Sequence, residues 1–286
     1  MAPQSGALLP PEASDAVLRN GIHHLAEPLH VTFIQNIYGA MCISAGGLLS
    51  VTLGAGFAGI QEQNNPGIQR LFQGATFPLG LVLVYLVGAE LFTGYPMWYT
   101  MCLLERKGKP LQYVRGAIAA WTGNLLGALL FSALFTNATD ALEKQPWHSA
   151  IVQQITEDIV DLPWHVIFLR AIGCGWLTTI AMYLGTQNQD GISKALCLHF
   201  PFMISASSRF PHIVEYMYLA TTGMQLGAPL SIVGFIWKCL LPVTLGNIVG
   251  GAFFTGAYLW WIHVYSGNRD KYDDGDLDGN LLDEHD

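Results

Sequence analysis

The chain has 286 residues, of which 51% are hydrophobic and only 12% are charged, and its mean hydropathy is +0.36. A soluble domain carries about 25% charged residues, so the composition argues against a soluble enzyme of this length. The net charge of −8 and the lack of a long basic cluster argue against binding to a nucleic-acid backbone.

The acidic residues gather near the end of the chain. Residues 269–286 contain eight acidic and two basic side chains, a net charge of −6, which leaves −2 for the other 268 residues. Charged side chains are costly inside a bilayer, so a nearly neutral and apolar chain is typical of a membrane protein. The segment 13–30 predicts a short amphipathic helix at the inner membrane surface.

Stretches free of Asp, Glu, Lys and Arg predict six membrane spans, because a spanning helix needs about 20 mostly apolar residues. Two hydrophobic regions are interrupted by charge: 71–104 by Glu90, and 195–226 by Arg209 and Glu215. We therefore predict an all-α membrane protein with six transmembrane helices in which spans 2 and 5 are broken. The expected spans cover about 33–57, 72–104, 112–136, 164–186, 195–226 and 234–264.

The basic residues predict the orientation of these spans. Even-numbered connections and the two tails hold eight Lys and Arg, whereas odd-numbered connections hold three. By the positive-inside rule, both termini are cytoplasmic in a multi-pass protein of the cell membrane. The predicted organisation is a cytoplasmic N-terminal segment (1–30), a six-span transporter domain (31–266) and an acidic cytoplasmic tail (267–286).

Two short motifs recur at the same distance along the chain. Phe77-Pro78 recurs as Phe200-Pro201, and Gly123-Asn124 recurs as Gly246-Asn247, each at an offset of 123. A shared offset indicates duplication of a three-span unit. An odd number of spans forces the two copies into opposite orientations, which predicts an inverted 3+3 repeat as in many transport proteins.

The same offset places the two polar interruptions at matching positions, with Glu90–Thr93 on Ile213–Tyr216. Irregular backbone at membrane depth persists only where protein or a water-filled cavity satisfies its polar groups, so the two breaks predict a transport pathway.

Several polar residues near the breaks are candidates for function. Glu90 is expected to tie down the loop of the first break, and Thr93 to offer a hydroxyl to the pore. His212 lies inside the second broken span, and an imidazole can pass a proton near physiological pH. Asn124 and Asn247 stand beside small residues, which favours helix packing over pore contact.

No residue pattern typical of a metal site or an enzyme is present in the sequence. The five cysteines lie within or beside apolar runs without a CxxC motif, and His23, His24 and the scattered carboxylates form no ligand spacing. We find no paired nucleophile and base, no HExxH and no nucleotide-binding loop. We therefore expect no enzymatic activity, no metal and no cofactor.

Five segments together resemble the formate/nitrite transporter family of pentameric anion channels and transporters. They are FPLGL (77–81), GAELFTG (88–94), TGNLLGALL (122–130), FLRAIGCGW (168–176) and LPVTLGNIVGGAFF (241–254). The resemblance covers about residues 33–265. It implies an aquaporin-like fold with one pore per protomer, assembled as a homopentamer.

The resemblance also implies roles for individual residues. Thr93 corresponds to the Ω-loop of span 2, and His212 to the central histidine that is a suspected proton donor. Four apolar residues match constriction positions of the pore: Phe77, Leu81, Leu91 and Phe92.

The chain departs from the family pattern around the expected pore. Pro211 stands for the Glu before the histidine, Tyr216 for an Asn after it, and Ser205 for a pore-flanking aromatic. A lysine expected before span 4 is missing, and Arg209 stands where a Gly is usual. Because a guanidinium suits a carboxylate, we hypothesise that Arg209 replaces the lysine as the residue that attracts anions.

The predicted function is transport of small monovalent weak-acid anions such as formate, nitrite or a related short carboxylate. Proton coupling through His212 is expected, because a bare charge between apolar constrictions is costly and protonation removes most of that cost. The expected partners are the anion, protons, the lipid bilayer and further copies of the chain, with no nucleic acid. Two alternatives remain: a passive anion channel, and a membrane protein that no longer transports and has a sensing or assembly role.

Overall fold

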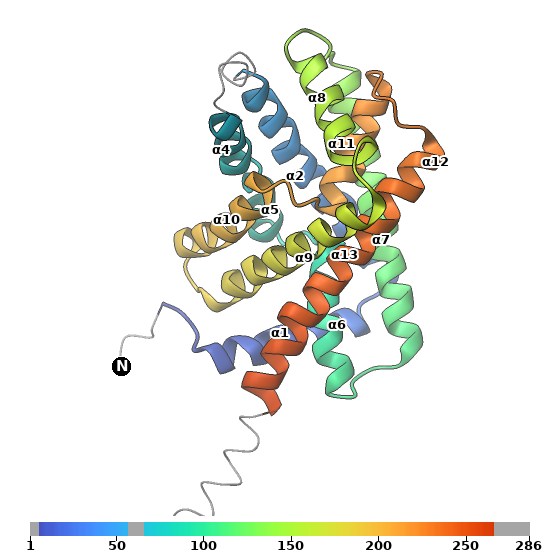
Figure 1. The fold of residues 1–286 in the computed structure, drawn as a ribbon. Coiled ribbons are helices and arrows are strands. Elements are labelled where there is room, and N and C mark those ends of the chain that lie inside the picture. The colour runs from blue at the N-terminus through green and yellow to red at the C-terminus, as the bar shows by residue number, and fades with distance from the viewer. Residues whose placement is uncertain (1–5, 57–65, 266–286) are drawn as a thin grey trace, which may run out of the picture.

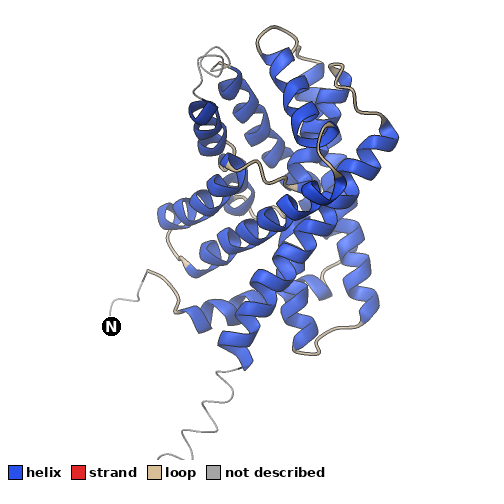
Figure 2. Cartoon of the chain, viewed as in Figure 1, coloured by secondary structure: helices blue, strands red, loops and turns tan. Residues whose placement is uncertain are grey.

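The computed structural model describes residues 6–56 and 66–265, and these are almost entirely helical, with a single isolated β-bridge between Ala7 and Asn188 (Figure 2). The helices are α1 (Pro10–Ala26), α2 (Leu29–Ala55), α4 (Pro66–Thr76), α5 (Leu79–Leu86), η1 (Phe92–Gly94), α6 (Tyr95–Leu104), α7 (Pro110–Phe131), η2 (Ser132–Asn137), α8 (Trp147–Ile155), η3 (Thr156–Val160), α9 (Trp164–Gln187), α10 (Gly191–Ser207), α11 (Ile213–Gln225), α12 (Ile232–Gly234), η4 (Phe235–Leu240), α13 (Leu241–Val249), η5 (Gly250–Ala257) and η6 (Trp260–Tyr265). The predicted acidic tail, 267–286, lies outside the described residues.

Among the described residues, four helical segments are long and apolar enough to cross a membrane. They run over Leu29–Ala55, Pro110–Asn137, Trp164–Gln187 and Ile232–Tyr265. These segments coincide with the first, third, fourth and sixth predicted spans. The chain between them is divided into shorter helices, α4 to α6 in one half and α10 to α11 in the other.

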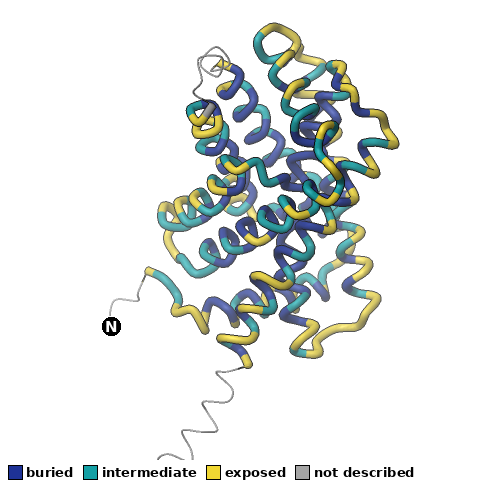
Figure 3. Tube along the Cα trace, in the orientation of Figure 1, coloured by how far each residue is buried: buried dark blue, intermediate teal, exposed yellow. Residues whose placement is uncertain are grey.

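The outer surface of the bundle is apolar. Ile118, Leu169 and Phe253 are 58%, 60% and 69% exposed, and Figure 3 shows exposed residues along the outward sides of the helices. Large exposed apolar areas are rare on soluble monomers and typical of surfaces that contact lipid or partner subunits. Together with the long apolar helices, this surface is that of a multi-pass membrane protein.

Helix α1 covers Pro10–Ala26, so it starts three residues and ends four residues before the predicted amphipathic segment 13–30. It ends before Pro28, because a proline disfavours helical geometry in the preceding residue. Ala13, Val17 and Leu25 are buried against the bundle. Figure 1 shows α1 and the end of the last described helix at one end of the bundle, with α4 and α8 at the opposite end.

The two halves of the chain pack their long helices with the same glycine contacts. A Cβ added to Gly127 would lie 2.1 Å from the carbonyl oxygen of Ile37, and one added to Gly250 would lie 2.2 Å from that of Ile172. Glycine therefore allows α7 to approach α2, and η5 to approach α9, more closely than any other residue would. The glycines repeat at the offset of 123, whereas the carbonyls that they face repeat at 135.

Candidate functional site

Two interruptions of helical structure lie between the long helices. In the first, α5 ends at Leu86, and the chain continues without a helix to η1 and then α6. In the second, α10 ends at Ser207 and α11 begins at Ile213. The backbone turns through left-handed conformations in both, with φ of +72° at Gly88 and +53° at Arg209. Such a φ favours glycine, so Arg209 adopts a backbone conformation that is uncommon for a residue with a side chain.

Asn124 and Asn247 are each fully buried and each fasten one interruption to its neighbours. The Asn124 side-chain oxygen accepts a hydrogen bond from the N–H of Phe92 at 2.7 Å, and the Asn247 oxygen accepts one from the N–H of Ile213 at 2.8 Å. Backbone groups freed by an interruption need such partners in an apolar environment. The two amides therefore do more than the helix packing that the sequence predicts.

The amide nitrogens complete the same pattern in both halves. Asn124 Nδ2 donates to the carbonyl of Asn36 at 2.7 Å, and Asn247 Nδ2 donates to the carbonyls of Ala171 at 2.8 Å and Pro211 at 3.1 Å. Each amide thus joins an interruption to the first long helix of its own half.

These contacts correct the predicted alignment of the two interruptions. The offset of 123 placed Glu90–Thr93 on Ile213–Tyr216, but the amides pair Phe92 with Ile213, an offset of 121. The reason is that 32 residues separate Phe92 from Asn124, whereas 34 residues separate Ile213 from Asn247. The two copies of the repeat therefore differ by two residues in the length of chain between the interruption and the asparagine.

The two interruptions bring Thr93 and His212 together. Thr93 Oγ1 lies 3.0 Å from His212 Nε2, and both residues are 0% exposed. The N–H of Glu215 donates to His212 Nδ1 at 3.3 Å. Because Nδ1 accepts this bond, the neutral ring carries its hydrogen on Nε2, which donates to the Thr93 hydroxyl.

The apolar residues that the sequence predicts as constrictions are buried in the structure. The four predicted constriction residues, Phe77, Leu81, Leu91 and Phe92, are all at most 4% exposed. The sequence analysis missed Phe202, which packs edge-on against His212 with ring centroids 5.3 Å apart and lies 4.9 Å from Phe77.

Ser205, which stands where the resembled family has an aromatic residue, lies one helical turn after Phe202 on α10. Ser205 is buried.

Arg209 is not the free cation that the hypothesis of an anion attractor requires. Its Nη1 lies 2.9 Å from Glu157 Oε2 and 3.1 Å from Asp158 Oδ1. Tyr216 joins the same network, because its hydroxyl donates to Asp158 Oδ2 at 2.8 Å. One guanidinium faces two carboxylates here, so the formal charge of the cluster is −1. Arg209 and Tyr216, which both differ from the resembled family, thus contact the same carboxylate, that of Asp158.

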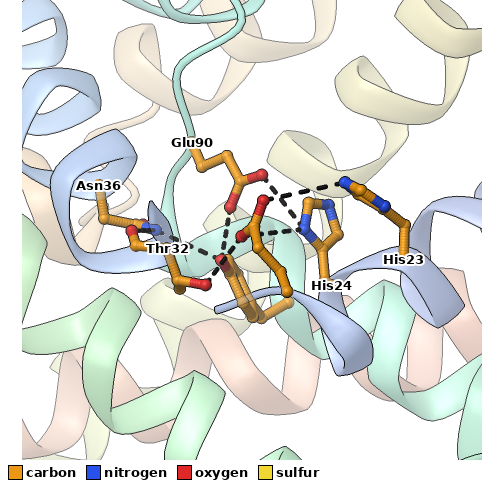
Figure 4. A network of polar contacts seen from close by, with 7 residues as sticks. His23, His24, Thr32, Asn36 and Glu90 are labelled. Carbon is orange, nitrogen blue, oxygen red and sulfur yellow. Dashed lines mark hydrogen bonds and ion pairs between the residues drawn. The ribbon is translucent and has the colours of Figure 1, made fainter. Parts of the chain in front are cut away.

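Glu90 connects the first interruption to three helices rather than only bracing its own loop. Its N–H donates to the carbonyl of Gln35 on α2 at 3.4 Å, and the Tyr95 hydroxyl of α6 donates to its Oε2 at 2.5 Å. His24 of α1 lies beside the other carboxylate oxygen (Figure 4). Burial, and next the charge of His23, lower the pKa of His24 to about 4, so its ring is uncharged at neutral pH.

A cavity opens beside each interruption. The larger one, about 200 Å³, is lined by His24, Leu81 and Glu90 among others. The smaller one, about 20 Å³, is lined by Arg209 and Tyr216 together with residues of α2, α4, η3 and α11. Thr93 and His212 line neither of these two cavities, and both residues are fully buried.

Comparisons with known proteins show what this chain is similar to. A family model described as "Formate/nitrite transporter" matches residues 11–261. The chain is similar to a protein of Methanothermobacter thermautotrophicus named as a probable formate transporter, with 31% identity over 250 residues that cover 83% of this chain and 90% of the relative.

Two solved structures share the fold. An FNT family ion channel superposes with a TM-score of 0.77 at 24% identity and covers 87% of this chain and 98% of its own. A pentameric formate channel with formate bound superposes with a TM-score of 0.73 at 24% identity, covering 82% and 98%.

We expect Asn124→Leu and Asn247→Leu to destabilise the protein by similar amounts. Each change leaves a buried N–H and a buried C=O without a partner, at about 1–3 kcal/mol per group. Thermal unfolding of the purified protein in detergent measures the effect, and Asn20→Leu on the exposed side of α1 is the matched control. Variants as stable as the control would show that the interruptions do not need the amides.

Proposed function

The chain belongs to the formate/nitrite transporter family, and from that premise we propose that it moves small monovalent weak-acid anions across the membrane. Formate, nitrite and related short carboxylates are the proposed substrates. The observation that carries the proposal is the buried contact between Thr93 and His212, where the two interruptions meet. The names of similar proteins as formate transporter and formate channel support transport rather than catalysis.

The apolar surroundings of this pair favour movement of the neutral acid. Phe77, Leu81, Leu91 and Phe92 are buried around the path, and an unpaired anion among such side chains is costly to desolvate. Binding a proton between them removes most of that cost. We propose that the substrate meets Thr93 and His212 as an anion and crosses the apolar layers as its conjugate acid.

The hydrogen-bond directions support donation by Thr93. His212 Nε2–H donates to the Thr93 oxygen, which leaves the threonine hydroxyl hydrogen for a substrate oxygen. A neutral imidazole has no proton to give away without becoming an anion. The transferred proton therefore comes from water, and uptake is driven by an inward proton gradient.

We propose that the chain forms six spans, with spans 2 and 5 broken, as an inverted 3+3 repeat with both termini in the cytoplasm. The repeated glycine and asparagine contacts support the repeat. Trp260 Nε1 donates a hydrogen bond to Glu105, which supports placing the C-terminal end of the last helix on the same side of the membrane as the basic connection 105–109. The pentameric solved relative and the exposed apolar surface support a homopentamer with one pore in each protomer.

Uptake of labelled formate and nitrite into proteoliposomes tests the proposal. With an inward proton gradient we expect faster uptake by the wild type. We expect at least about a tenfold loss in His212→Asn, because the Nε2–H that orients the Thr93 hydroxyl towards the substrate is removed and a hydrogen bond to a charged group contributes about 1.5–3 kcal/mol. His30→Asn, the same change at an exposed histidine, should behave as the wild type.

Two outcomes would contradict this proposal. Uptake that ignores the gradient and survives in His212→Asn would indicate a passive anion channel. Absence of uptake of both anions by the wild type would refute the proposed substrates.

The Arg209 cluster predicts a charge effect on the same uptake. Arg209→Gln leaves Glu157 and Asp158 without their cation, and we expect anion uptake to slow by up to about tenfold at low salt. Glu157→Gln removes one negative charge instead and should speed uptake, with both effects shrinking as salt rises. Equal uptake in the two variants at low salt would show that this cluster lies away from the anion path.

A further inference from the structure

Three side chains of metal-ligating type converge where α1 meets the first interruption. His24 lies in the last turn of α1, Glu27 is the residue that caps this helix, and Glu90 belongs to the interruption. One ligand atom from each lies within 4.8 Å of the other two. Their side chains are only 9%, 6% and 9% exposed. The fold brings Glu90 to the other two across more than 60 positions of sequence.

The imidazole of His24 points an unpartnered nitrogen into this group. Nδ1 is buried and makes no hydrogen bond to any described residue, although it lies 3.1 Å from Glu90 Oε1 and 3.9 Å from Glu27 Oε2. Bonds of about 2.0–2.2 Å to a tetrahedral ion place neighbouring ligand atoms about 3.3–3.6 Å apart. The observed separations lie on either side of that range.

Outer hydrogen bonds hold the ligand groups in place. The Thr32 hydroxyl donates to Glu27 Oε2 at 2.7 Å, and the Tyr95 hydroxyl donates to Glu90 Oε2 at 2.5 Å (Figure 4). The His24 ring stacks on Trp98 with centroids 4.4 Å apart. Such partners orient metal ligands, and here they leave Glu90 Oε1 directed towards the histidine.

The chemistry of the group also suits a cation. Two carboxyl groups and an imidazole meet in a mostly buried position. One nitrogen and two carboxylate oxygens suit a first-row transition-metal ion such as Zn²⁺, and three protein ligands leave a position open for water.

We propose that His24, Glu27 and Glu90 bind a divalent transition-metal ion. The ion joins α1 to the first interruption, beside the cavity of about 200 Å³ that His24 and Glu90 line. Its binding is independent of the proposed transport function, and it fixes the N-terminal helix over that cavity.

Zinc binding to the purified full-length chain tests the proposal. After removal of any affinity tag and treatment with a chelator, calorimetric titration with ZnCl₂ should give one saturable site per chain. Loss of an outer-shell partner costs about 10–100-fold in metal affinity, so Thr32→Val should weaken the site by that factor. His24→Ala and Glu27→Gln should weaken it at least as much, while His30→Ala leaves it unchanged.

Thermal unfolding with and without ZnCl₂ separates loss of the site from loss of the fold. Zinc should raise the unfolding temperature of the wild type and of His30→Ala above their zinc-free values, whereas that of His24→Ala should be the same with and without zinc. No saturable binding by the wild type would overturn the proposal. Equal zinc affinity in the wild type, His24→Ala and Glu27→Gln would also overturn it.

Discussion

The arrangement of this protein depends on one constraint, which is that backbone interrupted within an apolar bundle must find hydrogen-bond partners. Asn124 and Asn247 supply those partners from the long helices α7 and α13. Each amide accepts from an N–H of an interruption and donates to a carbonyl of the first long helix in its half. A side-chain amide suits this position because it has both a donor and an acceptor and carries no charge.

This bracing determines what the two interruptions present to each other. Thr93 follows Phe92, the residue held by Asn124, and His212 precedes Ile213, the residue held by Asn247. Their side chains therefore meet at 3.0 Å, with the ring of Phe202 packed edge-on against His212. The pair is one hydroxyl and one imidazole in surroundings that disfavour a bare anion. That combination links the packing of the helices to the proposed passage of a weak acid with its proton.

Local patterns in the sequence predicted the helical class and the residues of the central pair, because charge-free stretches and short motifs are local signals. Contacts between segments that are far apart in the sequence were harder to predict from these signals. The constant offset of 123 failed at the interruptions, since the connections in the two halves differ in length. Phe202 was missed because only the burial of one face of α10 distinguishes it from the exposed Phe200.

The sequence did not reveal the ion pairs of Arg209, because its two partners, Glu157 and Asp158, come from a separate element, η3. The sequence analysis did not identify the group of His24, Glu27 and Glu90 for the same reason. Ligand spacing in a sequence detects residues that share one element, whereas Glu90 reaches His24 and Glu27 only through the packing of α1 against the first interruption.

The most direct test of the central claim is a cryo-EM map of the full-length protein in lipid nanodiscs with formate. The account predicts density for a small anion within hydrogen-bond distance of Thr93 Oγ1 or His212 Nε2, with Asn124 and Asn247 still bonded to the two interruptions. Anion density confined to other parts of the molecule, or interruptions detached from the two asparagines, would contradict it.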